Sequence, residues 1–139
     1  MNFKNILRDS DLKVTLQRVH ILEITHSLGH ISIDDLHVEV KKVSPNISLA
    51  TLYKNLHVMV KANILKELKI PNLKSKYEIK KEPHAHLLCS TCNEFIDIKV
   101  DIENVLKSVA TTSSYKINSS ELIIDGVCLS CQELKGING

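Results

Sequence analysis

Residues 84–97 read H-A-H-L-L-C-S-T-C-N-E-F-I-D, and residues 128–131 read C-L-S-C. Together the two stretches contain all four cysteines of the chain. A tetrahedral zinc site takes four thiolates from two Cys-x-x-Cys pairs because each short turn presents both of its sulfurs to one ion. The spacing therefore predicts one structural zinc site, with the ligands Cys89, Cys92, Cys128 and Cys131.

The gap between the two pairs indicates how large a structure this zinc would hold. Thirty-five residues separate Cys92 from Cys128, more than in a usual zinc ribbon, so the ion is expected to join a whole substructure. Redox chemistry or disulfide bonding is the competing interpretation. A thioredoxin-like site needs a single Cys-x-x-Cys in a βαβ setting, however, and nothing in the sequence resembles a secreted protein.

The first stretch also carries a second set of potential metal ligands. His84 and His86 are two residues apart, so both imidazoles lie on one face of a β-strand, and Asp97 follows on the expected returning strand. Nitrogen and oxygen ligands of this kind suit a divalent metal such as iron, manganese or zinc. Surface histidines beside a zinc site are the alternative, because a His-x-His pair alone is a weak motif.

Length and composition limit the chain to one or two small domains. Its 139 residues include no tryptophan, so Ile, Leu and Val must form most of the core. Residues 1–82 carry 14 basic and 9 acidic side chains, a net charge of +5, whereas residues 83–139 carry 4 and 7, a net charge of −3. A basic first part suits a protein that binds a polyanion, and the alternative is ordinary solvated surface charge.

Because no signal peptide or membrane-length apolar run is found, we expect a cytoplasmic protein that has reduced cysteines and does not bind a membrane.

The beginning of the chain predicts a series of helices. A short helix is expected over residues 3–11, and a second begins after Thr15, a typical N-cap, and stops at Gly29. His30 is then expected in a loop, and Ser32 caps the next helix. Apolar residues follow both caps at steps of three and four, which indicates helices with one buried face.

The most regular apolar pattern follows Ser48, which is expected to cap a further helix. The apolar positions of that helix are Leu49, Leu52, Tyr53, Leu56, Met59 and Val60. Its other face carries, near the N-terminus, Ala50, Thr51, Lys54 and Asn55. Small, hydroxyl and basic side chains in this place are what a helix-turn-helix recognition helix presents to the major groove of DNA. A plain amphipathic helix with its polar side in water is the alternative.

Two strand-like runs follow, over residues 64–70 and 76–80, with a turn at Pro71 and Asn72, and they predict a hairpin. The hairpin is rich in lysine: Lys66, Lys69, Lys74, Lys76 and Lys80. A winged helix-turn-helix uses such a wing to follow DNA phosphates. Three helices and a basic hairpin therefore predict a winged-helix DNA-binding domain over residues 1–82.

Glu82 and Pro83 mark the expected domain boundary, since proline disfavours helix in the preceding residue and the charge balance reverses here. Residues 83–139 are expected to form a small α/β domain for metal binding and dimerisation. Its expected elements are strands at residues 84–89, 94–100 and 116–125 and a helix at residues 101–109. So small a core needs support from zinc and from a partner subunit. The predicted fold class is α+β.

The motifs together resemble those of a known family. The chain has T-x-Q-R at residues 15–18, S-L-A-T-L-Y at residues 48–53, H-A-H-x-x-C-x-x-C from His84 and a final C-x-x-C. This combination closely resembles the ferric uptake regulator family of metal-sensing repressors, and within it the peroxide-sensing repressors. The resemblance covers nearly the whole chain. It implies a homodimer whose winged-helix heads bind double-stranded DNA at an inverted-repeat operator, with a structural zinc held by the four cysteines.

The resemblance also implies the residues of two functional sites. The ligands of a regulatory iron(II) or manganese(II) would be His30, Glu78, His84, His86 and Asp97. With the polar helix face described above, the expected DNA contacts are Arg18, Ser48, Ala50, Thr51, Tyr53, Lys54 and Asn55. For Tyr53 the apolar spacing indicates the core and the resemblance indicates a base contact. We favour the contact because a phenol ring can pack while its hydroxyl reaches outward.

The same resemblance implies how the signal is sensed. A metal that joins His30 to ligands beyond residue 83 spans the domain boundary and can bias the angle of the DNA-binding heads. Five protein ligands leave one vacant octahedral position for peroxide. With iron(II), His30 and His84 would be oxidised to 2-oxohistidine, and the metal and the DNA would be released. Asp97 favours peroxide sensing because a longer glutamate could close the vacant position.

Some alternatives stay open. An iron-sensing or zinc-sensing repressor of the same family is the nearest one. Leu16 stands where the family commonly has proline, and Ser119 and Ser120 stand where many members have histidine, which puts an additional metal site on that strand in doubt. A small metallohydrolase is a remote alternative. We expect no enzyme, because the sequence offers no evident general base, substrate pocket or phosphate loop.

Overall fold

The computed structural model describes residues 1–134 and divides into two compact units. The first unit is Met1–Lys81, and the second begins at Glu82. Within residues 1–134, no helix has the length and apolar character needed to cross a membrane.

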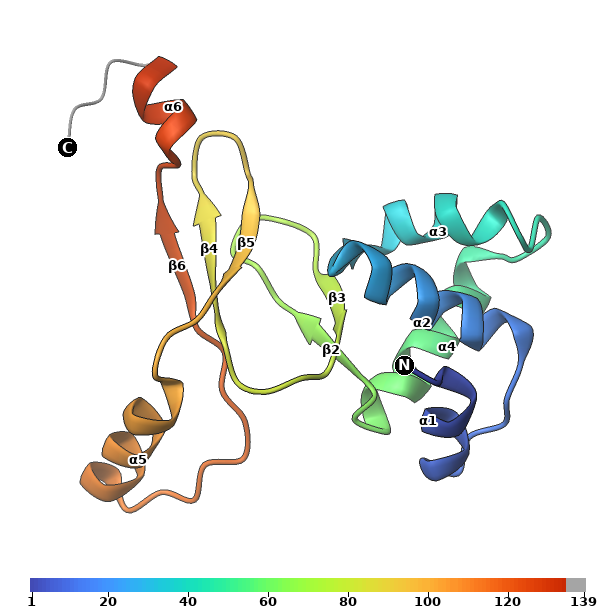
Figure 1. Ribbon diagram of the computed structural model, residues 1–139, viewed down its shortest axis with the longest axis horizontal. Helices are drawn as coiled ribbons and strands as arrows, with labels where there is room; N and C mark the ends of the chain where they lie inside the picture. Colours follow the sequence, from blue (N-terminus) through green and yellow to red (C-terminus); the bar gives the residue numbers. More distant parts are fainter. Residues whose placement is uncertain (135–139) are drawn as a thin grey trace. The chain divides into compact units, whose positions relative to one another are not determined.

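The first unit combines a group of helices with a small antiparallel sheet (Figure 1). Its helices are α1 (Phe3–Asp9), α2 (Leu16–Leu28), α3 (Ile33–Lys41) and α4 (Leu49–Lys61). Its strands are β1 (His30–Ser32), β2 (Leu65–Leu68) and β3 (Lys76–Ile79), in the order β1-β3-β2. Helices followed by a β-hairpin are the arrangement of a winged helix, so the α+β prediction is confirmed for this unit.

Short polar side chains set where the helices begin. Thr15, Ser32 and Ser48 each accept a hydrogen bond from the backbone N–H three residues later, which satisfies a donor that the first turn leaves without a helical partner. α2 ends at Gly29, whose φ of 83° suits a residue without a Cβ. These predicted caps and the predicted stop are confirmed.

The core of the first unit forms where the apolar faces of the helices meet the sheet. On α4 the buried residues are Leu52, Leu56 and Met59, which recur at steps of four and three. Leu49 and Tyr53 were predicted on the same apolar face, but they are 40% and 48% exposed. The prediction was too broad because these two residues lie on one flank of the buried stripe, rotated away from its centre.

One prediction for this unit is wrong. His30 is not in a loop: it begins β1, which pairs with β3 so that His30 lies opposite Glu78. A strand of only three residues is too short to produce a recognisable alternation of apolar and polar residues. The predicted hairpin is confirmed, because β2 and β3 pair in antiparallel register from Leu65 opposite Ile79.

The second unit has a sheet with the strand order β5-β4-β6. Its elements are β4 (Ala85–Cys89), β5 (Phe95–Ile98), α5 (Ile102–Ser113), β6 (Ile123–Gly126) and α6 (Leu129–Leu134). β4 pairs antiparallel with β5 and parallel with β6. In Figure 1, α5 and α6 lie beyond opposite ends of this sheet.

The second unit departs from the predictions at β6, α5 and α6. β6 begins at Ile123, so most of the strand predicted over residues 116–125 is irregular chain. α5 extends to Ser113 rather than residue 109, and the short helix α6 was not predicted. These are marginal elements whose ends depend on the neighbours they pair with, so local sequence predicts them poorly.

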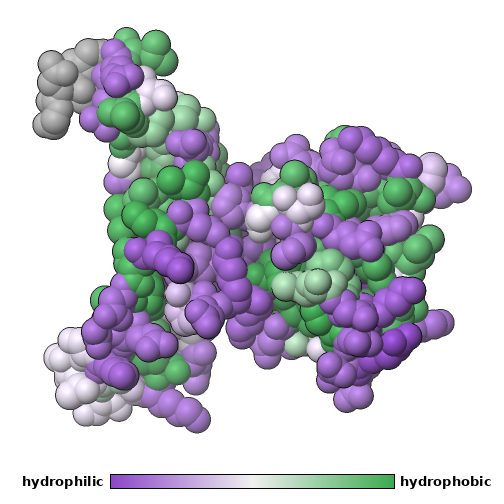
Figure 2. Space-filling view, in the orientation of Figure 1, coloured by the Kyte–Doolittle hydropathy of each residue, from purple (hydrophilic) through white to green (hydrophobic). Residues whose placement is uncertain are grey.

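This unit keeps much apolar surface exposed. Val105 and Val109 are 52% and 46% exposed, four residues apart on one face of α5, and Ile124 of β6 is 43% exposed. Figure 2 shows apolar side chains gathered along β6. An apolar surface of this kind is typical of a face that another protein covers.

Candidate metal centres and DNA-binding surface

The four cysteines come together at the end of the β4–β5 hairpin. Cys89 ends β4, Cys92 follows in the turn, and Cys128 and Cys131 lie at the start of α6. The four sulfurs lie within 4.8 Å of one another, and the sulfurs of Cys92 and Cys128 are 3.9 Å apart. All four are free thiols. The set has the number and type of ligands that a structural zinc needs.

The local backbone explains how these sulfurs are held. Asn93 adopts a left-handed φ of 64° and donates its N–H to the carbonyl of Cys89, which closes the turn. The sulfur of Cys89 accepts the backbone N–H groups of Cys128 and Cys92, at 3.4 and 3.5 Å. These two donors lower the pKa of the Cys89 thiol to about 6. A hydrogen bond with Cys128 and burial raise the pKa of Cys131 to about 12. The backbone therefore favours a thiolate at one member of the cluster before any ion binds.

A second cluster forms at the other end of β4. His86 lies directly opposite Asp97 in the β4–β5 register, and its Nε2 is 3.1 Å from the Asp97 Oδ1. The Nε2 of His84 is 3.0 Å from the Nε2 of His86 and 3.7 Å from the same carboxylate oxygen. The strand pairing thus brings together the three ligands that the sequence predicted for this part of the chain.

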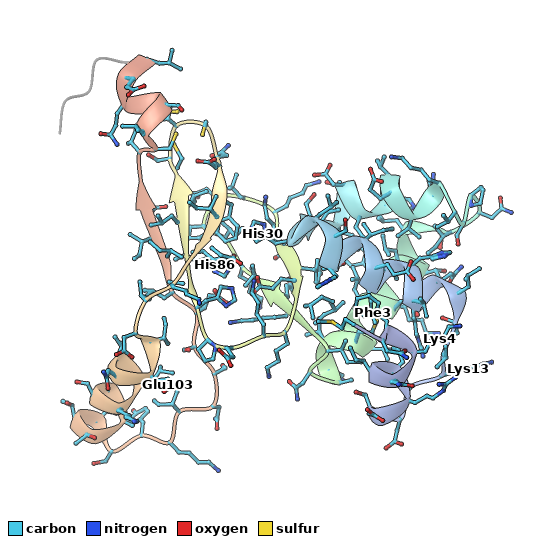
Figure 3. The ribbon with its side chains drawn as sticks, viewed as in Figure 1. Phe3, Lys4, Lys13, His30, His86 and Glu103 are labelled. Carbon is cyan, nitrogen blue, oxygen red and sulfur yellow. The ribbon has the colours of Figure 1, made fainter. Side chains whose placement is uncertain are left out.

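The two imidazoles have different surroundings. His84 places its Nδ1 2.9 Å from the carbonyl oxygen of Glu82, so Nδ1 is the donor in this contact. His86, labelled in Figure 3, is fully buried, and the ring of Phe95 stacks on it with centroids 4.7 Å apart. Two ring nitrogens 3.0 Å apart beside one carboxylate make an arrangement that a shared cation stabilises, so the donor set fits a divalent metal.

The two other predicted regulatory ligands lie in the first unit. His30 on β1 and Glu78 on β3 are direct cross-strand partners. Glu78 is only 1% exposed, and a carboxylate is rarely buried to this extent unless it is paired. The antiparallel pairing of two short strands therefore brings an imidazole and a carboxylate side by side.

The predicted DNA-binding residues lie on or beside the first turns of α4. Ser48, Ala50, Tyr53 and Lys54 are exposed, and Thr51 and Asn55 are partly buried. The Ser48 hydroxyl donates to the Thr51 hydroxyl, so these two side chains also hold the helix start. Tyr53 lies at the surface rather than in the core, which leaves its ring accessible to a partner.

Arg18 and Asn55 are joined to each other. The Arg18 Nε donates to the Asn55 Oδ1 at 3.1 Å, and its Nη1 donates to the carbonyl of Lys13 at 2.9 Å. Asn55 in turn donates its amide to the carbonyl of Thr51. Lys13 is labelled in Figure 3, in the segment between α1 and α2. The guanidinium therefore connects this segment, α2 and α4, which the sequence patterns did not reveal.

Comparison with known proteins agrees with this geometry. The model of the ferric uptake regulator family matches residues 9–125. The chain belongs to the ferric uptake regulator family. The recognition made from the sequence motifs is thus confirmed, and proteins of the ferric uptake regulator family are metal-dependent transcription regulators rather than enzymes.

Relatives in the ferric uptake regulator family carry two kinds of name. The peroxide operon regulator of Bacillus subtilis (strain 168) is 30% identical over 129 residues, covering 91% of this chain and 89% of its own length. The ferric uptake regulation protein of Campylobacter upsaliensis is 31% identical over 134 residues, covering 93% and 86%. Since the two identities are nearly equal, overall similarity does not choose between peroxide and iron as the signal.

Solved structures of the ferric uptake regulator family share the fold. The Campylobacter jejuni peroxide stress regulator has a TM-score of 0.78 and 30% identity, over 94% of this chain and 100% of its own. The Vibrio cholerae ferric uptake regulator has a TM-score of 0.76 and 31% identity, over 91% and 100%. The predicted architecture, a winged helix followed by a small α/β domain, is thereby confirmed.

Sequence reasoning missed two residues that surround His86. Phe95 stacks on its ring, and the Oε1 of Glu121 lies 3.4 Å from its Nδ1. Phe95 could have been recognised as the inward residue of the returning strand. Glu121 is 35 residues beyond His86 in the chain, and no spacing rule connects them.

Proposed function

We propose that this chain is a metal-dependent transcriptional repressor that senses peroxide through oxidation of histidine ligands. The observation that carries the proposal is the convergence of His84, His86 and Asp97 in a chain whose first unit is a winged helix. We expect the cluster to bind the regulatory metal and the winged helix to bind DNA. Family membership supports the combination.

The cysteine cluster is proposed to hold a structural zinc. Cys89 and Cys92 come from the β4–β5 hairpin, whereas Cys128 and Cys131 come from the α6 region. Four thiolates close the coordination sphere and join segments that are far apart in the chain. The buried apolar residues of this unit are few, so zinc ligation is expected to contribute much of its stability.

The regulatory site is proposed to use His30, Glu78, His84, His86 and Asp97. The cross-strand pair His30 and Glu78 supplies two donors from the first unit, and the other three come from the second. With ligands from both units, the chain can bind iron(II) or manganese(II) completely only in certain arrangements of the units. Metal binding would then change the affinity for DNA, and DNA binding would change the affinity for metal by the same factor.

DNA binding is proposed to use α4 as the recognition helix and the β2–β3 hairpin as the wing. The exposed side chains at the start of α4 face solvent, and the hairpin adds lysines that suit phosphate contacts. The exposed apolar face of α5 and β6 supports a homodimer, and a two-fold protein suits an inverted-repeat operator.

Peroxide sensing is proposed to modify His30 and His84. Bound iron(II) would activate peroxide, so that one peroxide oxygen is added to an imidazole ring, which gives up two electrons, and the other oxygen leaves as water. The His84 side chain is 12% exposed, whereas that of His86 is fully buried. This difference supports His84 as the reactive ring of the pair. An oxidised ring is a poorer ligand, so the protein would lose its metal and then release DNA.

Iron sensing is the second candidate function. It is favoured by the relative named as a ferric uptake regulation protein, whose identity is as high as that of the peroxide regulator. In that case the metal would bind and leave reversibly, and no histidine would be oxidised.

The two candidates differ in one measurement. An operator is first selected from a random DNA pool with manganese-loaded protein, and iron-loaded and manganese-loaded samples then receive a brief dose of peroxide. Peroxide sensing predicts one added oxygen on the peptides that contain His30 or His84, only with iron, together with loss of operator binding by fluorescence anisotropy. Release of DNA by a chelator without histidine oxidation after peroxide would favour iron sensing. Metal-independent DNA affinity would contradict both.

A further inference from the structure

The turn that leads into α4 is anchored by one buried residue. Residues 42–48 connect α3 to α4 (Figure 1). Within this turn Ile47 is only 4% exposed and its side chain belongs to the core of the first unit, whereas its neighbours Asn46 and Ser48 are exposed. The chain is therefore fixed to the core one residue before Ser48, the N-cap of α4.

Both backbone polar groups of Ile47 have partners. Its N–H donates to the carbonyl of Ser44 at 3.1 Å, which closes the turn. Its carbonyl oxygen lies 3.0 Å from the Nε2 of His37, a residue of α3. A carbonyl oxygen carries no hydrogen, so the ring nitrogen must donate in this contact. A side chain of α3 thus holds the backbone immediately before α4.

The hydrogen bonds inside α4 fix its first turn only relative to Ser48. Ser48 accepts the N–H of Thr51 at its hydroxyl and the N–H of Leu52 at its carbonyl, each at 3.1 Å. The position of Ser48 depends in turn on the point at which the chain enters the helix. Because a hydrogen bond is restricted in direction as well as in length, the bond from His37 to Ile47 restrains that entry point.

Recognition of bases is sensitive to where the first turn of α4 lies. Ala50, Tyr53 and Lys54 are exposed on the first turns of α4, and they are proposed to contact DNA. Contacts with base edges are made at short range, so a small shift of the helix start breaks them. Attraction to phosphates depends mainly on charge and tolerates the same shift. Loss of the anchor is therefore expected to reduce sequence-specific binding more than non-specific binding.

We propose that His37 is a positioning residue for DNA recognition, because its Nε2–H holds the Ile47 carbonyl and so places the first turn of α4 against the bases. The inference rests on the proposed role of α4 as the recognition helix. His37 is partly buried on α3, and the role assigned to it acts through the backbone of Ile47. It lies outside both clusters of potential metal ligands, so its loss should not change metal binding.

The test compares His37→Leu, His37→Asn and His37→Gln with the wild-type protein, each as the manganese-loaded full chain. Fluorescence anisotropy at one salt concentration measures affinity for the selected operator and for an unrelated duplex of the same length. Leu has no donor, and the amide of Asn is too short to reach the position of Nε2. Both variants are expected to lose about 2–10-fold in operator affinity, the effect of one ordinary hydrogen bond, at unchanged affinity for the unrelated duplex. The longer amide of Gln reaches that position and should restore most of the loss.

A matched control and a stability measurement make the result specific. His26→Leu makes the same substitution at an exposed histidine of α2 and should leave both affinities unchanged. Manganese affinity should equal that of the wild-type protein in every variant. Thermal unfolding shows whether each variant is folded at the temperature of the assay. If His37→Leu is not, the comparison of His37→Asn with His37→Gln still carries the test.

Wild-type operator affinity in both His37→Leu and His37→Asn would show that the contact does not position α4. An equal loss for both duplexes would mean that His37 serves only the general fold. A loss that His37→Gln does not restore would mean that the donated hydrogen bond is not the cause.

A double variant, Tyr53→Ala with Lys54→Ala, tests the proposed recognition helix separately. Wild-type operator affinity in the double variant would contradict the proposed DNA-binding surface and, with it, this inference. If the double variant loses affinity while the His37 variants do not, the positioning role is wrong and the proposed surface stands.

Discussion

The two clusters of potential metal ligands share β4 but differ in how far the second unit completes them. At the end of the strand, Cys89 belongs to a set of four sulfurs within 4.8 Å of one another. Near its start, His86 belongs to a set in which two imidazoles and the carboxylate of Asp97 converge. Four thiolates fill a tetrahedral site, whereas three nitrogen and oxygen donors leave half of an octahedral site to other ligands.

This difference teaches which cluster can carry a signal. A site closed by its own unit has no position for a further ligand and is suited to stability. A site that needs donors from elsewhere responds to whatever changes those donors. The cysteine cluster is therefore expected to determine whether the second unit folds, and the histidine cluster to determine whether the folded protein binds DNA.

The largest expected effect comes from breaking the closed cluster. Cys128→Ser should remove the zinc and, with it, the dimer, because structural zinc contributes about 10–16 kcal/mol of apparent binding free energy to small domains. Metal analysis and analytical ultracentrifugation measure the two losses. Ser130→Ala, an exposed neighbour on α6, is the matched control and should keep both. A stable dimer in Cys128→Ser would show that the cluster is not structural.

Disrupting the histidine cluster should leave the fold intact. His86→Ala is expected to lower manganese affinity by more than the factor of about 100 that marks the upper range for residues outside the ligand shell. Zinc content and dimerisation should persist, and operator binding should lose its dependence on manganese. Isothermal titration and fluorescence anisotropy measure these properties. Loss of zinc together with manganese would mean that the two clusters are not independent.

Loss of a DNA contact should weaken operator binding without changing either metal-ligand cluster. Arg18→Ala removes a cation held by Asn55 and by the carbonyl of Lys13, and it should weaken operator binding at constant manganese affinity. If Arg18 contacts one phosphate, the slope of log affinity against log salt should become shallower by about 0.9. Asn55→Ala is expected to give a smaller change in the same direction, because it frees the guanidinium without removing its charge. An unchanged salt slope in Arg18→Ala would rule out the phosphate contact.

The smallest expected effect concerns the Tyr53 hydroxyl. Tyr53→Phe removes one hydrogen-bonding group from a side chain that is 48% exposed, so thermal stability should stay the same. Operator affinity should fall by about 0.5–1.5 kcal/mol, the contribution of a typical hydrogen bond. Thermal unfolding and anisotropy distinguish the two properties. Reduced stability with unchanged affinity would return Tyr53 to a packing role.

Local sequence was sufficient wherever a few neighbouring residues determine the geometry. Thr15, Ser32 and Ser48 predicted helix starts because a cap needs only its own hydroxyl and an N–H three residues later. His84 and His86 predicted a shared strand face for the same reason, since alternation is a property of the strand alone. The Cys-x-x-Cys spacing predicted a cluster because each pair is a single turn.

Predictions failed where a distant partner decides the outcome. His30 forms a strand because β3 lies beside it, and its own three-residue segment carries no such pattern. Leu49 and Tyr53 have the apolar spacing of core residues, but they lie on one flank of the buried stripe of α4 and stay 40% and 48% exposed. The contact between Arg18 and Asn55 joins residues that the sequence presents only as two separate polar positions.

The amino-acid sequence by itself thus determined the family, the helix starts and the types of metal ligand, since these depend on residue identity and on short spacings. Only the tertiary structure decided that Asp97 lies opposite His86 and that Glu121 lies behind it. Both placements follow from strand register, which is set by the burial of whole strands and by their backbone hydrogen bonds. Such a contact produces no periodic pattern in the sequence, because the two residues that form it can be far apart along the chain.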